Sequence, residues 1–452
     1  MTDGFLLGID IGTSSCKAVV LGADGAEYGG AERPTPWSTT SRSPTLDARD
    51  LLATTLETCA AAQYGIGGPI VGIGVASMAE AGFLLDVDGA ALAPALTWGD
   101  ARAAELVPSL AEDLPDFTAM TGLPVSAKPS LVKHRWLVDT DPALARSVGW
   151  SNVAEYVVHL LGGERVAEPS LASRTGWLDV ERLDWWPDAL AWSGVDATFL
   201  PPLRTAGSPL GVVDGIPGLE GAALTVAGHD HLCAAVGVGA VTADDVVDSC
   251  GSAEVLLRAV APPLPRPRRR WAAALGFTTG RHVVAGQLAL IGGFPSGARL
   301  RRLAALLGFA DPRGADRNAW LGSPSAPPVD AERLDQWIDE LTVTGPPPDA
   351  ASAGQMWRAA VESIAAKAAE RHATLIELTG PARRVITTGG SSRDALVAEA
   401  RQRHLPGLEH RPVSQAAARG AALFAAVAAG VDVADAAALR PRGGSAGPEG
   451  RS

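Results

Sequence analysis

The chain opens on the stretch FLLGIDIGTSSCKAVVL, residues 5–21, in which two apolar runs flank a short polar segment. Apolar runs on either side of a tight polar turn are typical of two paired β-strands. The turn consists of Gly12, Thr13, Ser14 and Ser15. Glycine turns without a Cβ clash, and consecutive N–H groups beside hydroxyls form a nest suited to phosphate. The stretch predicts a β-hairpin with a phosphate-binding turn, and an ordinary hairpin is the alternative.

Asp10 stands where the first of these strands meets the turn. A carboxylate beside a phosphate turn can hold Mg²⁺, directly or through water, because Mg²⁺ takes oxygen ligands and keeps several waters. The turn is not a Walker A loop, since no Gly-Lys-Ser/Thr follows the strand. We therefore expect a hairpin of another kind, with Asp10 as its candidate metal ligand.

Length and charge limit the possible classes of protein. At 452 residues the chain exceeds the usual size of one hydrophobic core, so two domains are expected. The formal charge of −12 argues against a nucleic acid or an anionic membrane as partner. One basic run, residues 266–270, is the exception. We predict that it forms a solvated loop, because it lacks the interleaved aromatic residues of a nucleic-acid surface.

The cysteines and the hydropathy of the chain indicate in which cellular compartment the protein is expected. The four cysteines are scattered without a C-x-x-C pair, which suits a reducing compartment and argues against a structural zinc site. No charge-free apolar stretch reaches about 18 residues, and no leader pattern opens the chain. We expect a soluble, cytoplasmic protein. The cysteines are Cys16, Cys59, Cys233 and Cys250.

Polar residues follow the apolar stretch 69–77, which predicts a buried strand. Glu80 comes just after it, and a second apolar segment near residue 96 leads into Trp98, Asp100 and Arg102. Such residues at strand ends can line a pocket for a hydroxyl-rich ligand. The alternative is that these are ordinary polar surface residues at the ends of strands.

A second polar cluster lies in residues 224–237, where a short strand runs into Gly-His-Asp-His and then a small-residue helix. Asp230 would lie in the first turn of that helix, where the macrodipole favours its charged form. A carboxylate there can take the proton of a hydroxyl that attacks phosphorus. An N-terminal capping aspartate is the alternative. His229 and His231 also suggest a zinc site, which we disfavour because no third ligand set is evident in the sequence.

Residues 246–257 repeat the design of the opening hairpin, with a turn that contains Gly251 and Ser252 between two apolar strands. Two phosphate-type hairpins, one in each half of the chain, are more specific than one. They indicate two related α/β domains with a nucleotide between them.

A third element, residues 384–394, predicts a strand, a Gly-Gly turn and the start of a helix, which allows a flat or anionic ligand to approach the backbone. A plain strand-to-helix turn is the alternative. A small-residue helix over residues 416–430 is expected to pack behind it. Apolar spacing predicts further helices over 47–62, 300–307 and 355–378. The Trp-rich stretch 177–192 is expected to pack in a core.

Taken together, these segments resemble the FGGY carbohydrate kinases. Residues 8–17 resemble the first phosphate motif of that family, residues 228–230 the motif of its catalytic base, and residues 249–254 its second phosphate motif. Residues 389–391, with the helix over 416–430, resemble its adenosine motif. Residues 98–102 and 172–176 also match segments of the family. The resemblance runs from about residue 5 to 430 in the family's order.

The resemblance implies an α/β fold of two actin-like (ribonuclease H-like) domains with a nucleotide and substrate cleft between them. The N-terminal domain would cover residues 1–243 and the C-terminal domain 244–436, with a disordered tail over 437–452. It implies transfer of the γ-phosphoryl group of ATP, with Mg²⁺, to a sugar or polyol. A homodimer is left open as the oligomeric state.

The resemblance also assigns roles to residues. Asp230 would be the general base and Asp10 the metal ligand. The substrate-binding set would be Glu80, Trp98, Asp100, Arg102, His229 and Asp230. The nucleotide-binding set would be Gly12, Thr13, Ser14, Ser15, Lys17, Gly251, Ser252, Gly389, Gly390, Ser391 and Asp394.

The chain departs from the family at several points. Ser252 stands where threonine is usual, and Thr388 where a third glycine is common. The family's Gly-x-Arg-x-Pro and Arg-Gly blocks are not found between residues 294 and 357, and the sequence around Glu80 matches neither the xylulose kinase nor the glycerol kinase pattern. The sugar is therefore not assigned. A sensing or regulatory protein with the same fold is the alternative to an active kinase. An actin-like chaperone is disfavoured by the Gly-His-Asp motif and by the lack of a peptide-binding β domain.

Overall fold

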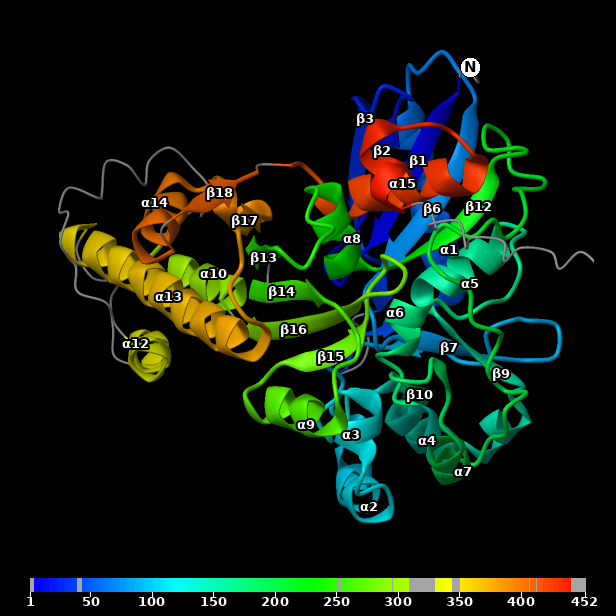
Figure 1. Ribbon diagram of the computed structural model, residues 1–452, viewed down its shortest axis with the longest axis horizontal. Coiled ribbons are helices and arrows are strands. Elements are labelled where there is room, and N and C mark those ends of the chain that lie inside the picture. Colours follow the sequence, from blue (N-terminus) through cyan, green and yellow to red (C-terminus); the bar gives the residue numbers. More distant parts are fainter. Residues whose placement is uncertain are drawn as a thin grey trace, which may run out of the picture.

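The computed structural model describes residues 4–38, 43–250, 254–294, 296–308, 330–343, 350–405, 407–411 and 413–439. Two β-sheets organise these residues, one formed by the first half of the chain and one by the second (Figure 1). Within the described residues, no helix combines the length and apolarity needed to cross a bilayer.

The first sheet has the strand order β12-β6-β1-β2-β3. β1 and β2 form the predicted antiparallel hairpin, β3 continues it antiparallel to β2, and β6 and β12 add parallel strands on the other side of β1. Its strands are β1 (Phe5–Ile11), β2 (Ser15–Leu21), β3 (Glu27–Pro34), β6 (Ile70–Ser77) and β12 (Ala223–His229).

The second sheet repeats this plan, with the order β15-β16-β14-β13-β17-β18. β13 and β14 form an antiparallel hairpin, β16 pairs antiparallel with β14, and β17 and β18 are parallel additions beside β13. When β13 is matched to β1, only the edge strand β15 lacks a counterpart. The strands are β13 (Asp245–Cys250), β14 (Glu254–Val260), β15 (Thr278–Arg281), β16 (Leu288–Phe294), β17 (Arg384–Thr388) and β18 (Leu408–His410).

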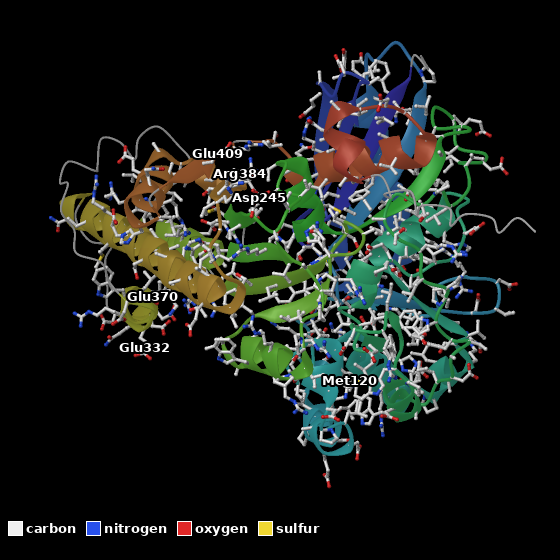
Figure 2. The ribbon with its side chains drawn as sticks, in the orientation of Figure 1. Met120, Asp245, Glu332, Glu370, Arg384 and Glu409 are labelled. Atoms are coloured by element: carbon white, nitrogen blue, oxygen red, sulfur yellow. The ribbon has the colours of Figure 1, made fainter. Side chains whose placement is uncertain are left out.

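An ion-pair group ties the parallel strands of the second sheet together. The Nε of Arg384 on β17 is 2.7 Å from Asp245 Oδ1 on β13, and its Nη1 is 3.8 Å from Glu409 Oε2 on β18. Figure 2 shows these three side chains together at that end of the sheet. The group contributes to the register of strands that come from distant parts of the sequence.

Small strands and helices pack around the first sheet. Phe117, Trp177, Trp186 and Trp192 are buried in one apolar cluster, which confirms that the tryptophan-rich stretch packs in a core. The small strands are β4 (Trp37–Ser38), β5 (Thr45–Leu46), β7 (Gly82–Leu85), β8 (Ala95–Leu96), β9 (Gly149–Asn152), β10 (Leu178–Asp179) and β11 (Asp184–Trp185). The helices are α1 (Ala48–Gln63), α2 (Val107–Asp113), α3 (Phe117–Thr121), α4 (Ser130–Thr140), α5 (Val153–Leu160), α6 (Pro169–Ala172), α7 (Pro187–Ser193) and α8 (Asp230–Gly237).

Helices of the second half form a separate apolar cluster, in which Trp357 of the long helix α13 packs with Leu303 of α10 and Ile338 of α12. The predicted helices near residues 300 and 360 are confirmed. The helices of this half are α9 (Arg266–Ala274), α10 (Gly297–Leu306), α12 (Ala331–Val343), α13 (Ala350–Thr379), α14 (Ala395–His404) and α15 (Ala416–Ala429). Short 3₁₀ helices are η1 (Arg102–Leu106), η2 (Pro142–Arg146), η3 (Gly390–Arg393) and η4 (Ala434–Leu439).

The basic run 266–270 is not the solvated loop that we predicted, because it forms the first half of α9. Pro267 near the N-terminus of this helix favours a helical start. Arg269 is only 1% exposed, and it donates hydrogen bonds to the carbonyl oxygens of Ala119 and Leu264, both at 2.6 Å. The run therefore links the second half of the chain to α3.

Helix α15 also differs from our prediction. Instead of packing behind residues 389 and 390, it lies across β1 and β6 of the first sheet and against α8 (Figure 1). Glycines allow this contact, since an added Cβ at Gly8 would meet Ala418 O at 1.9 Å and one at Gly420 would meet Cys233 O at 1.9 Å. The small residues of α15 thus bring its backbone directly onto the sheet.

The predicted domain boundary at residues 243 and 244 falls between α8 and β13. It stays a prediction, as does the disordered tail. Of that predicted tail, residues 437–439 end η4, and residues 440–452 lie outside the described residues.

We predict that Gly8→Ala lowers the free energy of unfolding by roughly 3 kcal/mol, because the new methyl group would overlap the Ala418 carbonyl oxygen. Chemical denaturation measures the loss. Gly67→Ala is the matched control, since nothing lies within 4 Å of its added Cβ, and it should stay within about 0.5 kcal/mol of the parent. Equal losses in both variants would contradict the close packing of α15 on β1.

Candidate functional site

The candidate site is built at the carboxyl ends of the parallel strands of the first sheet. Asp10 on β1 is in register with Ala76 on β6, which is in register with Gly228 on β12. Asp230 then begins α8 directly after β12. Because parallel strands end at one sheet edge, Asp10 and Asp230 lie near each other, and the charge of Asp230 contributes to raising the pKa of Asp10.

Asp10 has an unsatisfied oxygen. The residue is 5% exposed, its Oδ2 is 3.8 Å from Lys17 Nζ, and its buried Oδ1 has no hydrogen-bond partner. Burial raises the pKa of Asp10 from 3.8 to about 7, with Lys17 opposing and Asp230 adding to the rise. A buried carboxylate oxygen without a partner, beside a second carboxylate, fits a hard divalent cation such as Mg²⁺.

The turn of the first hairpin is open to solvent at Thr13 and Ser14. Indole groups hold it from two sides. Trp98 Nε1 donates to Thr13 Oγ1 at 2.9 Å, and Trp37 Nε1 donates to the Thr13 carbonyl at 2.6 Å. Gly12 N donates to Ser15 O at 3.0 Å and closes the turn. The structure therefore brings the predicted phosphate turn and the predicted substrate residue Trp98 together.

Glu80 occupies a strained position beside this turn. Its φ of 61° lies in the left-handed region, which non-glycine residues rarely adopt. Lys133 from α4 stabilises it, since the buried Nζ donates to Glu80 O at 2.7 Å and to Trp98 O at 3.3 Å. Burial lowers the pKa of Lys133 to about 8, although Glu80 and Asp100 oppose the shift. Strain of this kind is common at functional sites.

The Glu80 carboxylate is held by Arg174, whose Nη2 lies 2.5 Å from Glu80 Oε1. The other arm of this guanidinium donates to Thr278 Oγ1 on β15 at 2.7 Å. Arg174 therefore connects a candidate substrate residue to the edge strand of the second sheet, and we had not predicted this role for it.

Asp100 and Arg102 form a local ion pair. The Arg102 Nη2 and Asp100 Oδ2 atoms are 2.7 Å apart, and Arg102 Nε is 3.0 Å from each carboxylate oxygen. Burial alone would raise the pKa of Asp100, but the hydrogen bonds and charge of Arg102 outweigh burial and keep it below its usual value. Arg102 also lies over the ring of Trp136, 5.3 Å from its centroid.

Asp230 has two local contacts. Its Oδ1 accepts from His231 N at 2.6 Å and lies 3.3 Å from His229 Nε2. Burial lowers the pKa of His229 well below its usual value, and the charges of His231 and Arg174 lower it further. His229 is therefore neutral at pH 7, and Asp230 beside it is half-buried. His229, not Asp230, occupies the N-cap position of α8.

A buried network behind His229 was not predicted. Ser170 Oγ accepts from His229 N at 3.0 Å and donates to a carboxylate oxygen of Glu168. Gly228 leaves room for this pair, since an added Cβ there would lie 2.6 Å from Ser170 Oγ. Burial raises the pKa of Glu168 to about 8, with its hydrogen bonds opposing the rise. The network fixes the backbone that presents Asp230.

The predicted nucleotide residues of the second half are only partly described. Gly251 and Ser252 lie outside the described residues. Gly389 has a φ of 99°, and an added Cβ there would meet Cys250 O at 2.7 Å, so the Gly-Gly junction touches the second hairpin. Gly390 and Ser391 belong to η3, and Asp394 caps α14 by accepting from Leu396 N at 3.0 Å.

The repeated sheets match the structures of sugar kinases, which have two actin-like ATPase domains. Xylulose kinase from Rhodospirillum rubrum gives a TM-score of 0.80 at 24% identity, over 96% of this chain and 92% of that chain. Glycerol kinase from Plasmodium falciparum, solved with ADP, gives a TM-score of 0.78 at 17% identity, over 97% of this chain and 92% of that chain. The predicted fold class of two actin-like domains is therefore confirmed.

The sequence profile of the FGGY family of carbohydrate kinases, N-terminal domain, matches residues 5–237, just over half of the chain. The chain belongs to this family. Glycerol kinase from Rhodopseudomonas palustris is 30% identical over 264 residues, which are 55% of this chain and 52% of that protein. Xylulose kinase from Escherichia coli is 27% identical over 264 residues, 55% of this chain and 53% of that protein. The chain thus matches about half the length of these curated relatives.

We predict that Mg²⁺ binding strengthens with pH up to about 8 and that Asp10→Asn abolishes this dependence. The folded chain holds the Asp10 proton more tightly than the unfolded chain, so this group lowers the free energy of unfolding as pH rises from about 4 to about 7. A cation competes with the same proton, and its affinity should fall roughly tenfold per pH unit below 7. Displacement of Mn²⁺, followed by its paramagnetic signal, measures the affinity.

Asp50→Asn is the control for this measurement, because Asp50 is an exposed residue in the first turn of α1. It should keep the pH dependence of the parent chain. An unchanged dependence in Asp10→Asn would show that the cation binds elsewhere.

Proposed function

We propose that the protein is an ATP-dependent carbohydrate kinase, which transfers the γ-phosphoryl group of MgATP to a hydroxyl of a sugar or polyol. Membership of the FGGY family supports this class of reaction. The observation that carries the proposal is local: one sheet edge combines an open Gly-Thr-Ser turn, the unsatisfied buried carboxylate of Asp10 and the half-buried carboxylate of Asp230. These are the parts that a phosphoryl transfer needs for positioning and charge neutralisation.

Asp230 would act as the general base. As the substrate hydroxyl oxygen bonds to the γ-phosphorus, its proton would pass to the Asp230 carboxylate while the bond from the γ-phosphorus to the bridging oxygen of ADP breaks. The buried neutral His229 would not compete for this proton, because its pKa is lowered by burial. The Glu168–Ser170 network would keep the backbone of this segment in place.

Asp10 would hold Mg²⁺, which when bound would neutralise phosphate charge. Thr13 and Ser14 of the first turn would face the transferred phosphate, with Lys17 adding a positive charge 3.8 Å from the Asp10 carboxylate. The second turn, with Gly251 and Ser252, would bind the remaining phosphates. Gly389, Gly390 and Ser391 would contact the adenosine, and Asp394 would support them by capping α14.

Glu80, Trp98 and His229 would contact the sugar, between Arg174 and the first turn. The Glu80 carboxylate would accept a substrate hydroxyl in addition to Arg174, which already holds it in position. Asp100 and Arg102 would shape the pocket as a pair, since each satisfies the other. A screen of ADP release with MgATP against ketoses, polyols and aldonates would identify the substrate. Silence across that panel in a chain that binds ATP would favour the sensing alternative.

We predict that Asp230→Asn lowers turnover roughly 10²-fold or more while the affinity for MgATP stays within about twofold, because the amide cannot accept the proton. Coupled ADP-release kinetics and a nucleotide titration measure the two effects. Asp139→Asn is the control, since Asp139 only forms an i,i+4 ion pair with Arg135 on the surface. Full activity of Asp230→Asn would contradict its role as general base and leave it a local structural role beside His229 and His231.

We predict that Glu80→Gln raises the KM for the sugar about tenfold or more and leaves the KM for ATP unchanged, because the hydroxyl loses a charged acceptor. Steady-state kinetics with each substrate varied in turn give the comparison. Glu57→Gln provides the control, because Glu57 pairs with Arg33 on the surface at 3.3 Å. Equal changes in both KM values would remove Glu80 from the sugar pocket.

A further inference from the structure

Arg401 of α14 is one of the largest fully buried side chains in the described part of the protein. It is 1% exposed, and its guanidinium reaches two buried carboxyl groups. Nη1 lies 3.3 Å from Asp248 Oδ2, and Nη2 pairs closely with Glu254 Oε2. Asp248 is completely buried and Glu254 is 1% exposed. A buried charge of this kind is costly unless it is paired, so the three residues form one unit.

The unit lies between two segments to which the proposed function assigns nucleotide binding, the second hairpin (β13 and β14) and the Gly-Gly junction (residues 389 and 390). Asp248 lies on β13 and Glu254 begins β14, so the two carboxyl groups stand on either side of the second hairpin turn. The helix that carries Arg401 follows η3, the segment after the Gly-Gly junction. Arg401 therefore joins the hairpin to the helix that continues from the junction.

Two further observations show how close these elements are. The backbone of Gly389 abuts Cys250 so tightly that an added Cβ would lie 2.7 Å from the Cys250 oxygen. A small cavity lies between the hairpin and the helices that surround it, and Ser391 and Arg401 line it together with Cys250 and Glu254. The end of β13 and the candidate adenosine junction thus meet close to the buried guanidinium.

The charges of the unit balance only if one carboxyl group is protonated. Burial raises the pKa of Glu254 well above its usual value, and Asp248 adds to the rise while Arg401 opposes it. His372 of α13 is close enough for Asp248 to affect its pKa, but burial lowers that pKa and keeps the imidazole neutral. With one of the two carboxyl groups protonated and Arg401 charged, the unit is neutral and does not repel phosphate.

The side chains of Asp248, Cys250 and Glu254 also lie within 4.8 Å of one another, a spacing that a metal ion can use. Arg401 pairs with both carboxyl groups, however, and supplies the positive charge that a cation would supply. The arrangement fits an ion-pair unit better than a metal centre.

We propose that Arg401 is a positioning residue for the nucleotide: it sets the placement of the strands of the second hairpin, β13 and β14, relative to the Gly-Gly junction, and it thereby controls affinity for ATP and ADP without affecting affinity for the sugar. This inference rests on the proposed kinase function. Buried ion pairs are poor stabilisers compared with apolar groups of the same size. The benefit of this ion-pair unit is therefore the alignment of β13, β14 and α14, which carry its three residues.

The experiment titrates the full-length chain with MgADP, which needs no knowledge of the sugar. Arg401→Met should raise the Kd for MgADP tenfold or more, and Arg401→Lys should recover part of the affinity, because lysine keeps the charge but loses the two-armed contact. Should Arg401→Met fail to fold, the triple variant D248N/E254Q/R401M removes every charge of the unit and leaves none unpaired. It should fold and show the same loss of affinity.

Arg258→Met is the matched control. Arg258 is 4% exposed on the same strand β14, and it joins that strand to the end of α13 through Thr379 Oγ1 at 2.7 Å, but it lies toward the other end of β14 from Glu254. Its Kd for MgADP should stay within about twofold of the parent. Once the sugar is known, the KM for ATP should rise in the Arg401 variants while the KM for the sugar stays constant.

The outcomes separate the two claims. Parent-like affinity for MgADP in folded Arg401 variants, or an equal loss in Arg258→Met, would overturn the positioning role and leave the kinase proposal intact. A parent chain that neither binds MgADP nor releases ADP with any sugar would overturn both proposals.

Discussion

The structure depends on the direct contact between the backbone of α15 and the first sheet. Gly8 and Gly74 on the sheet lack the Cβ atoms that would otherwise keep the sheet apart from the helix backbone, and Gly420 on the helix allows the same close approach to α8. The contact brings the last helix of the described chain onto its first strand, and it buries the small residues on both sides. Close packing of this kind tolerates no added atom, so it holds the strands whose ends carry Asp10 and Asp230.

The raised pKa of Asp10 at the candidate site depends on how this sheet places its charged residues. Asp10 and Asp230 approach each other because parallel strands end at one edge, and burial then makes the charged form of Asp10 costly. Two cations of the site already have partners: Lys133 donates to carbonyl oxygens, and Arg174 pairs with Glu80. The unsatisfied carboxylate oxygen of Asp10 is the feature of this site that favours a divalent cation.

Much of this arrangement was predictable because its signals are local. The two hairpins, the strand that precedes Asp230 and the Gly-Gly junction each depend on residues within about fifteen positions of one another, and each lies where the pattern predicts it. The errors have a different origin. The basic run forms a helix, whose start is favoured by Pro267. Arg269 is buried because it reaches a carbonyl group on α3, a contact that no local pattern identifies.

By itself, the sequence determined the order of the strands and turns, the likeness of the two halves and the placement of Asp10 and Asp230 at strand ends. Only the tertiary structure decided where α15 packs and which partners hold Glu80, His229 and Arg401. The reason is physical. Hairpins and caps form from neighbouring residues, whereas the contacts of Lys133, Arg174 and Arg401 join residues far apart in the chain, and their energies depend on burial that exists only after the whole chain has folded.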